Sequence, residues 1–288
     1  MKKVNKKKKH QNSIIPIVII VLVTILAISG ALLVYIYTQN YIVIEKVKQP
    51  ATVEKGTTVS PIIVNNAVIG GVTDTGKFTN YKVASSNMKI LESTELDMYK
   101  KNGKIGTYEI NSVKKIDDSI TSVIPFKDIS AIEYVAVLSS EKNIMLRETV
   151  ELKGADEDEK YVKKALGKYR LFNNTVKINE VNEVYLTTDE KTRIICATSK
   201  GDTTFGAYSA IIAVKGKEAK IIKYAYVKNT ESSINWPIYS LSFVCDLNGD
   251  ETYELIVQET KEQAVKYSVI EYKKGQYYEV VGTDIKIK

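Results

Sequence analysis

Short apolar runs separated by turn residues fill the chain between residues 61 and 153. The runs are residues 62–64, 67–69, 96–99, 105–110, 132–138 and 144–152. Asn65-Asn66 separates the first two runs, and Asn102-Gly103 separates the next two. Asn-Gly between two apolar runs is the strongest short signal for a β-hairpin. We therefore predict a small β-rich domain over residues 61–153.

A single helical pattern follows this region. Asp156 stands three residues before Glu159, which resembles a capping box. Apolar side chains then recur at helical spacing, opposite a set of lysines. The apolar positions are Tyr161, Val162, Ala165, Leu166, Tyr169 and Phe172, and the lysines are Lys160, Lys163, Lys164 and Lys168. The pattern predicts an amphipathic helix that packs on a sheet and keeps its lysines in solvent.

Beyond residue 172 the chain repeats itself. Residues 192–198 match residues 253–259, and residues 208–217 match residues 267–276. Each unit reads as a strand, a polar loop, a longer strand, a glycine-centred turn and another strand. Two such blade-like antiparallel meanders are too few to close a propeller. We expect them to pack on each other, backed by the preceding helix, as a second domain over residues 154–288. The predicted fold class is mainly β, with a minor helical part.

A third kind of pattern occupies the N-terminal region. Residues 14–37 form a run of 24 residues without a charged side chain. About 20 apolar residues span a bilayer core, so the run is long enough to cross with some tilt. A cleaved signal peptide has a shorter apolar core and a small-x-small cleavage site. Val34-Tyr35-Ile36 does not provide that site. We predict an uncleaved transmembrane signal anchor over residues 14–37.

The charge of the chain gives the anchor its orientation. Residues 1–13 hold six lysines and no acid, and the rest of the chain holds 35 basic and 34 acidic residues. Most of the formal charge of +7 therefore comes from the N-terminal tail, and we expect no nucleic-acid partner. The positive-inside rule predicts a cytoplasmic tail over residues 1–13 and an extracellular location for residues 38–288. Residues 38–60 lack apolar periodicity and predict a stalk or linker.

Two compositional features bear on the compartment. Lysine supplies 38 of the 41 basic residues, and this bias is typical of an AT-rich genome, which indicates a low-GC Gram-positive bacterium. Cys196 and Cys245 are the two cysteines. A disulfide outside the cell and two buried thiols in separate strands both account for them.

One loop carries oxygen-bearing side chains at alternate positions. Asp246, Asn248, Asp250 and Glu254 supply side-chain oxygens, and Thr252 offers its main-chain carbonyl. Calcium takes about six to eight hard oxygen ligands, which this alternation provides. An EF-hand is excluded, because its sixth and twelfth positions need Gly and Glu. Two other interpretations bind no calcium. One is a plain polar turn whose side chains accept hydrogen bonds from neighbouring amides, and the other is a degenerate loop that has lost its site.

The same loop resembles the short Asp-rich calcium loop of FG-GAP and VCBS-like β repeats, including those of membrane-anchored clostridial surface proteins. The resemblance covers residues 180–282, where an apolar strand lies on each side of the loop. It implies one Ca²⁺ held by the five residues named above. The family has glycine after its second aspartate, where this chain has Glu251. If that position needs a positive φ, a side chain there costs about 1 kcal/mol.

Histidine limits the reactions that the exterior can support. The chain has one histidine, His10, in the predicted cytoplasmic tail. Ser-His-Asp or Cys-His catalysis and histidine-ligated zinc are therefore disfavoured outside the cell. We expect a single-pass, membrane-anchored extracytoplasmic binding or scaffolding protein of the cell surface, without catalysis, whose partner is a wall component, a surface protein or a glycan.

Two alternatives remain open. A wall hydrolase would use a pair of carboxylates that face each other across an aromatic-rimmed cleft. An extracellular sensor would signal through a cytoplasmic tail, but 13 residues are too few to fold into an output domain.

Overall fold

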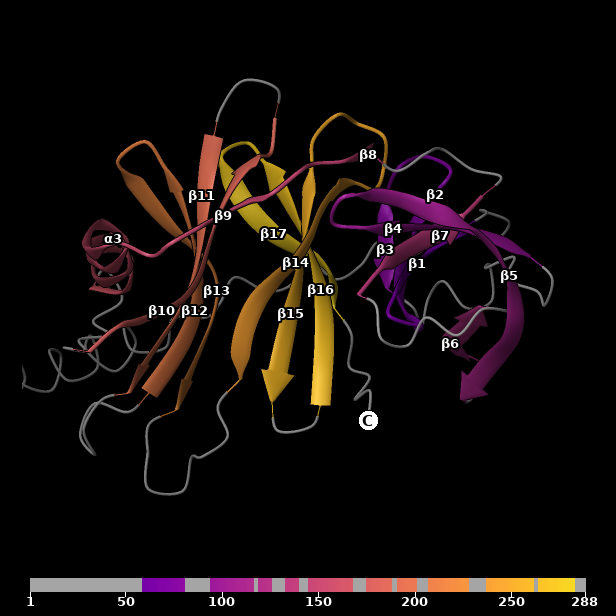
Figure 1. The fold of residues 1–288 in the computed structure, drawn as a ribbon, viewed down its shortest axis with the longest axis horizontal. Helices are drawn as coiled ribbons and strands as arrows, with labels where there is room; N and C mark the ends of the chain where they lie inside the picture. The colour runs from indigo at the N-terminus through magenta and orange to yellow at the C-terminus, as the bar shows by residue number, and fades with distance from the viewer. Residues whose placement is uncertain are drawn as a thin grey trace, which may run out of the picture. The chain divides into compact units, whose positions relative to one another are not determined.

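The computed structural model describes a mainly β protein, as predicted. The described residues are 59–80, 94–116, 119–125, 133–139, 145–167, 175–187, 191–200, 207–227, 237–261 and 264–282. All of them belong to one compact unit, Val47–Lys288. Within these ranges the strands form three antiparallel sheets, accompanied by one helix (Figure 1).

The predicted anchor at residues 14–37, its tail and all but the last two residues of the predicted stalk lie outside the described residues. Among the helices of the described ranges, none is long and apolar enough to span a bilayer. Residues 59 and 60, the end of the predicted stalk, already belong to the first strand.

The first sheet, sheet A, has seven strands in the order β1-β7-β4-β5-β6-β2-β3. Their bounds are β1 Val59–Val64, β2 Ala67–Thr73, β3 Phe78–Asn80, β4 Glu95–Lys100, β5 Gly103–Ile116, β6 Ser119–Pro125 and β7 Val135–Leu138. Because β1 also pairs with β2, six of these strands form a closed ring around a core that includes Ile63, Leu96 and Met98. The alternate residues Ile62 and Val64 face a second core.

Local turn chemistry sets two hairpins of sheet A. Val64 pairs with Ala67, which leaves Asn65 and Asn66 as a two-residue turn with φ values of 47° and 70°. Two positive φ values are what a type I′ turn requires, and asparagine tolerates them better than most residues. The β4–β5 hairpin turns directly before Gly103, whose φ is 127°. The hairpin predicted at Asn102-Gly103 is confirmed, and Asn65-Asn66 forms another.

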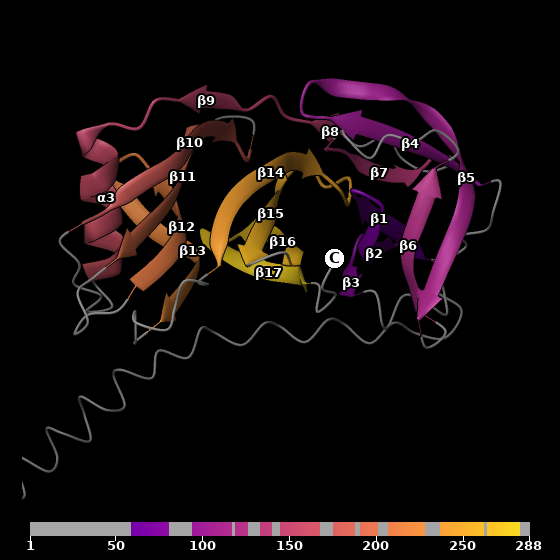
Figure 2. The same cartoon turned by 60° about the horizontal axis from the view of Figure 1, so that its bottom comes forward.

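The other two sheets are the two meanders that the repeat predicts (Figure 2). Sheet C runs β13-β12-β11-β10-β9, and sheet B runs β17-β16-β15-β14-β8. The bounds in sheet C are β9 Val150–Leu152, β10 Lys177–Tyr185, β11 Lys191–Lys200, β12 Ala207–Lys215 and β13 Glu218–Val227. Those in sheet B are β8 Met145–Leu146, β14 Ile238–Asp246, β15 Glu254–Lys261, β16 Ala264–Lys273 and β17 Gln276–Gly282.

The short strands β8 and β9 tie the end of the predicted first domain to the later sheets. Leu146 pairs with Cys245 of β14, and Leu152 pairs with Val181 of β10. Residues 145–152 therefore complete sheets B and C rather than sheet A.

Helix α3, Asp156–Gly167, covers the outer face of sheet C and buries Val162, Ala165 and Leu166 there. Its capping differs from the predicted Asp156–Glu159 box by one residue. The Ala155 amide donates to Oδ2 of Asp158 at 2.8 Å, so the reciprocal side chain is Asp158. Oδ1 of Asp158 accepts from Nη1 of Arg193 on β11 at 2.9 Å, which ties the start of the helix to the sheet.

Sheet B is packed on both faces. One face shares a core with sheet C, and the other shares a core with β1, β2, β3, β4 and β7 of sheet A. Cys196 lies in the first of these cores and Cys245 in the second, and both are buried free thiols. Of the two interpretations of the cysteines, the structure has the separate buried thiols, and burial raises the pKa of both.

Candidate ligand sites in sheets B and C

The acidic loop connects β14 to β15 and curls around Asp246. Oδ1 of Asp246 accepts the amides of Gly249 at 2.6 Å and Asp250 at 3.2 Å, and its Oδ2 accepts the amide of Glu251 at 3.0 Å. The Asp246 side chain is buried at the end of β14. This network holds the loop closed, as an aspartate at the first position of a tight turn does.

The next two candidate ligands also accept loop amides. Oδ1 of Asn248 accepts the Asp250 amide at 3.1 Å, and Oδ1 of Asp250 accepts the Thr252 amide at 2.9 Å. The Asn248 side-chain amide donates to Oδ2 of Asp250 at 3.2 Å. The structure thus brings Asp246, Asn248, Asp250 and Thr252 together, and the side-chain oxygens of the first three accept the hydrogen bonds of a polar turn.

Glu251 adopts a positive φ, the conformation that favours glycine, which the FG-GAP and VCBS-like loops have at this position. Its φ is 66°, and Gly249, two residues earlier, has a φ of 74°. A left-handed conformation costs a side-chain-bearing residue about 1 kcal/mol relative to glycine. The strain expected at this position is therefore present.

Glu254 differs from the other candidates because one of its oxygens is unsatisfied. Its side chain is fully buried, and Oε2 accepts the Leu247 amide at 2.9 Å. Oε1 is buried without a hydrogen-bond partner in the described part of the chain. Burial raises the pKa of Glu254 to about 9, and the nearby charges of Asp250 and Asp246 add to the shift. Without a cation, this carboxyl is protonated at neutral pH.

The acidic loop also has a neighbour in sheet A. A Cβ atom added to Gly76, in the β2–β3 turn, would lie 3.5 Å from the carbonyl oxygen of Asn248. Over the described ranges, no three His, Cys, Asp or Glu side chains converge on one point as metal ligands. The chemistry of the donors fits calcium, and the unsatisfied Glu254 oxygen is the feature that a hydrogen-bonded turn leaves unexplained.

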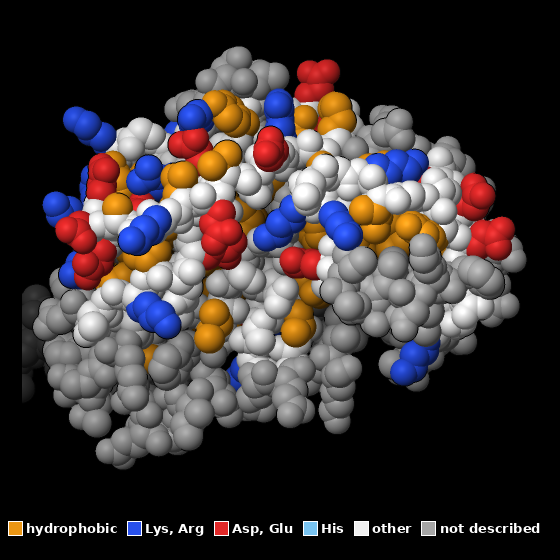
Figure 3. All heavy atoms as spheres, in the orientation of Figure 1, with side chains coloured by type: hydrophobic (Ala, Val, Ile, Leu, Met, Phe, Trp, Pro, Cys, Tyr) orange, Lys and Arg blue, Asp and Glu red, His pale blue; other side chains and the backbone are white. Residues whose placement is uncertain are grey.

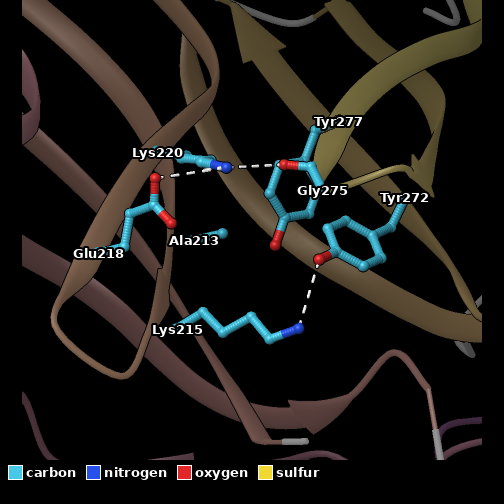
Figure 4. Close-up of a pocket in the computed structure, with 7 residues that line it drawn as sticks. All are labelled: Ala213, Lys215, Glu218, Lys220, Tyr272, Gly275 and Tyr277. Atoms are coloured by element: carbon cyan, nitrogen blue, oxygen red, sulfur yellow. Dashed lines mark hydrogen bonds and ion pairs between the residues drawn. The ribbon is translucent and has the colours of Figure 1, made fainter.

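A cavity of about 320 Å³ lies between sheets C and B, at the β12–β13 and β16–β17 turns (Figure 4). Its lining residues are Ala213, Lys215, Glu218, Lys220, Tyr272, Gly275 and Tyr277. The two turns occupy matching places in the repeat, where Ala213 corresponds to Tyr272. The methyl group of Ala213, in place of a second phenol ring, leaves room for a cavity here.

Aromatic groups and one lysine form one side of the cavity. The rings of Tyr272 and Tyr277 have centroids 5.0 Å apart and are tilted by 43°. Lys215 Nζ donates to the Tyr272 hydroxyl at 3.3 Å and lies 5.4 Å from the centre of the same ring. Lys215 therefore contacts Tyr272 through a hydrogen bond to its hydroxyl group and a cation–π interaction with its ring.

A second lysine joins the two turns on the other side. Lys220 Nζ donates to the Gly275 carbonyl at 2.8 Å and lies 3.4 Å from a carboxylate oxygen of Glu218 (Figure 4). The lining thus contains two ammonium groups and one carboxylate. Residues 213–220 and 271–277 together carry five lysines and two glutamates, which makes this edge basic.

The described surface elsewhere mixes both signs of charge. On the face seen in Figure 3, acidic side chains are interspersed with lysines and arginines. Two carboxylates share one lysine at the junction of sheets C and B. Lys223 of β13 lies 3.6 Å from Glu259 and 3.1 Å from Glu279, and it donates to the Ser268 hydroxyl at 2.9 Å. One lysine therefore joins β13 to three strands of sheet B.

The acidic loop is visible in the sequence, whereas the cavity residues are not marked by any motif. The sequence places the two glycine turns at equivalent positions of the repeat, and this equivalence is the signal that two lysine-rich turns meet. No family model, curated protein or solved structure matches the chain significantly. The FG-GAP and VCBS resemblance therefore remains a prediction from the loop.

Proposed function

We propose that the chain is a single-pass, membrane-anchored binding or scaffolding protein of a Gram-positive cell surface. The uncharged run at residues 14–37 and the lysines before it support the anchor and its orientation. The three packed sheets are then an extracellular body that presents the cavity of sheets B and C. That cavity, rimmed by tyrosines and lysines, is the observation that carries the binding function.

The lining of the cavity favours binding over glycoside hydrolysis. A hydrolase of the kind considered above needs two carboxylates about 5–10 Å apart on either side of the bond it cleaves. The cavity has an aromatic rim, but Glu218 is the one carboxylate among its lining residues, beside Lys215 and Lys220. The pair Glu259 and Glu279 is held by Lys223, and neither residue lines the cavity.

Two measurements test this function. External protease should remove residues 38–288 from intact cells that express the full chain, whereas protection of these residues or a mature N-terminus beyond residue 37 would contradict the anchor. Purified cell walls should pellet the full chain, and Lys215→Gln should weaken this binding. Lys261→Gln is the matched control, because Lys261 lies at the opposite end of sheet B, where it pairs with Ala264. Equal pelleting of all three proteins would refute the cavity as the binding site.

We propose in addition that the acidic loop holds one Ca²⁺. The side chains of Asp246, Asn248, Asp250 and Glu254 and the carbonyl of Thr252 would hold it. The support is the buried, unsatisfied Oε1 of Glu254 beside Asp246 and Asp250. A divalent cation would supply the missing partner and offset the crowding of three carboxylates.

Thermal unfolding of the full chain tests the calcium site. At a calcium concentration about 100 times Kd, binding stabilises a protein by about 2.7 kcal/mol, which raises Tm by roughly 5–10 °C in a protein of this size. Asp250→Ala should abolish the shift, and Glu109→Ala, an exposed acid of β5, should keep it. An unshifted Tm in the unmodified protein, or an equal shift with magnesium, would refute calcium binding.

A further inference from the structure

We infer that the cavity between the β12–β13 and β16–β17 turns binds a sugar that carries a carboxylate or a phosphate. The inference deepens the proposed binding function and rests on it, since it names the ligand of the same cavity. Its three supports are the charge of the lining, the two tyrosine rings and the single carboxylate at the rim.

The charge of the cavity selects an anion. Lys215 and Lys220 bring two ammonium groups to a space that contains one carboxylate, Glu218. The two turns add the exposed lysines Lys217 and Lys273, so an approaching anion meets a positive edge. A cavity with low-dielectric walls and one excess sign of charge concentrates ligands of the opposite sign. Lysine ammonium groups bind carboxylate and phosphate oxygens as point charges.

The tyrosines select a ligand with a ring rather than a bare anion. Tyr272 and Tyr277 present two tilted rings on one side of the space, and each carries a hydroxyl group (Figure 4). Such a surface accepts the apolar face of a sugar ring, while the Tyr272 hydroxyl, which accepts from Lys215 at 3.3 Å, can donate its own proton to a ligand oxygen. The volume of about 320 Å³ matches a small ligand.

Replacing Glu218 should change the affinity for an acidic ligand in the opposite direction to replacing Lys215. Its side chain is 62% exposed and pairs with Lys220 at 3.4 Å. In the free protein this carboxylate pairs with Lys220, so an acidic ligand has to compete with it on binding. Removing its charge should therefore strengthen binding of an acidic sugar, which no misfolded variant would do.

Calorimetry on the full chain tests the inference with three probes: trigalacturonic acid, glucose 6-phosphate and the neutral sugar maltotriose. We expect one or both acids to bind at least tenfold more tightly than maltotriose, and the tighter acid identifies carboxylate or phosphate as the anionic group. For that acid, Lys215→Gln should weaken binding about tenfold and Glu218→Gln should strengthen it at least twofold. Lys261→Gln should leave binding within twofold, and added salt should weaken it.

Several outcomes would overturn the inference. If maltotriose bound as tightly as the acids, the ligand would not need an anionic group. If Glu218→Gln weakened binding, or if Lys261→Gln weakened it as much as Lys215→Gln, the cavity would be refuted as the binding site. Absence of binding by both acids, in a protein that cell walls still pellet, would refute this ligand while leaving the proposed binding function in place. If the acids bound but cell walls did not pellet the protein, the proposed wall-binding function would be refuted while the ligand of the cavity would stand.

Discussion

Replacing Glu254 with glutamine is expected to stabilise the calcium-free protein at neutral pH. The Glu254 carboxyl is fully buried, and its pKa is raised from 4.5 to about 9, first of all by burial. At pH 7 the folded protein keeps this group protonated, whereas the unfolded chain ionises it. Folding therefore takes up a proton, and the cost of that uptake grows with pH.

The size of the effect follows from the two pKa values. Each pH unit above the unfolded value costs about 1.4 kcal/mol, which gives roughly 3 kcal/mol at pH 7. Since the folded pKa is the higher one, the contribution of Glu254 to stability is complete below about pH 4.5 and is lost progressively up to about pH 9. Glutamine does not ionise and still offers an oxygen to the Leu247 amide. We expect Glu254→Gln to gain about 1–3 kcal/mol at pH 7 and nothing near pH 4.5.

Urea unfolding in EDTA between pH 4.5 and 9 measures this difference. Glu109→Gln, at an exposed position of β5, controls for the loss of a negative charge and should show no such pH dependence. A Glu254→Gln protein that is less stable than the parent by the same amount at every pH would refute the reasoning. With saturating calcium the order should reverse, because the proposed site needs the carboxylate.

Three further changes probe the fold around the sites, each measured by the urea midpoint. Glu251→Gly should stabilise the protein by about 1 kcal/mol by relieving the φ of 66°, and no change would show that the position is unstrained. Arg193→Met should destabilise it by about 2–4 kcal/mol, since it leaves the buried Asp158 without its 2.9 Å partner, and a neutral outcome would contradict that role. Gly70→Ala should cost about 1–3 kcal/mol, because its Cβ would lie 2.7 Å from the backbone oxygen of Thr79, and full stability would show that β3 can move away.

The parts of the fold that the sequence predicts are those set by neighbouring residues. Asn65-Asn66 and Asn102-Gly103 define their hairpins through their own backbone preferences, and the two matched segments define two similar meanders. Helix α3 follows from its apolar spacing. For the hairpins and the helix the information lies within about ten residues, which is the range over which periodicity and turn chemistry act, and for the meanders it lies in the match between two segments of the chain.

The parts that the sequence does not predict depend on distant partners. Asp158 rather than Glu159 completes the helix start, because Arg193, 35 residues later, holds the Asp158 side chain in place. The cavity depends on Ala213 and Tyr272 taking equivalent places in two facing sheets. The oxygen pattern of the acidic loop is visible in the sequence, but the burial that leaves one Glu254 oxygen unsatisfied is a property of the packed sheets.

The strap of residues 145–152 joins an early pairing in sheet C to a late pairing in sheet B. Its first strand, β8, must wait for Cys245, 99 residues after Leu146, whereas its second strand, β9, finds its partner at Val181. Pairings of such sequence separation are slow to form. On a ribosome, sheet C can close while β8 is still an unpaired edge strand that waits for sheet B to emerge. A cut or an insertion at residues 147–149 should therefore slow the closure of sheet B more than that of sheet C.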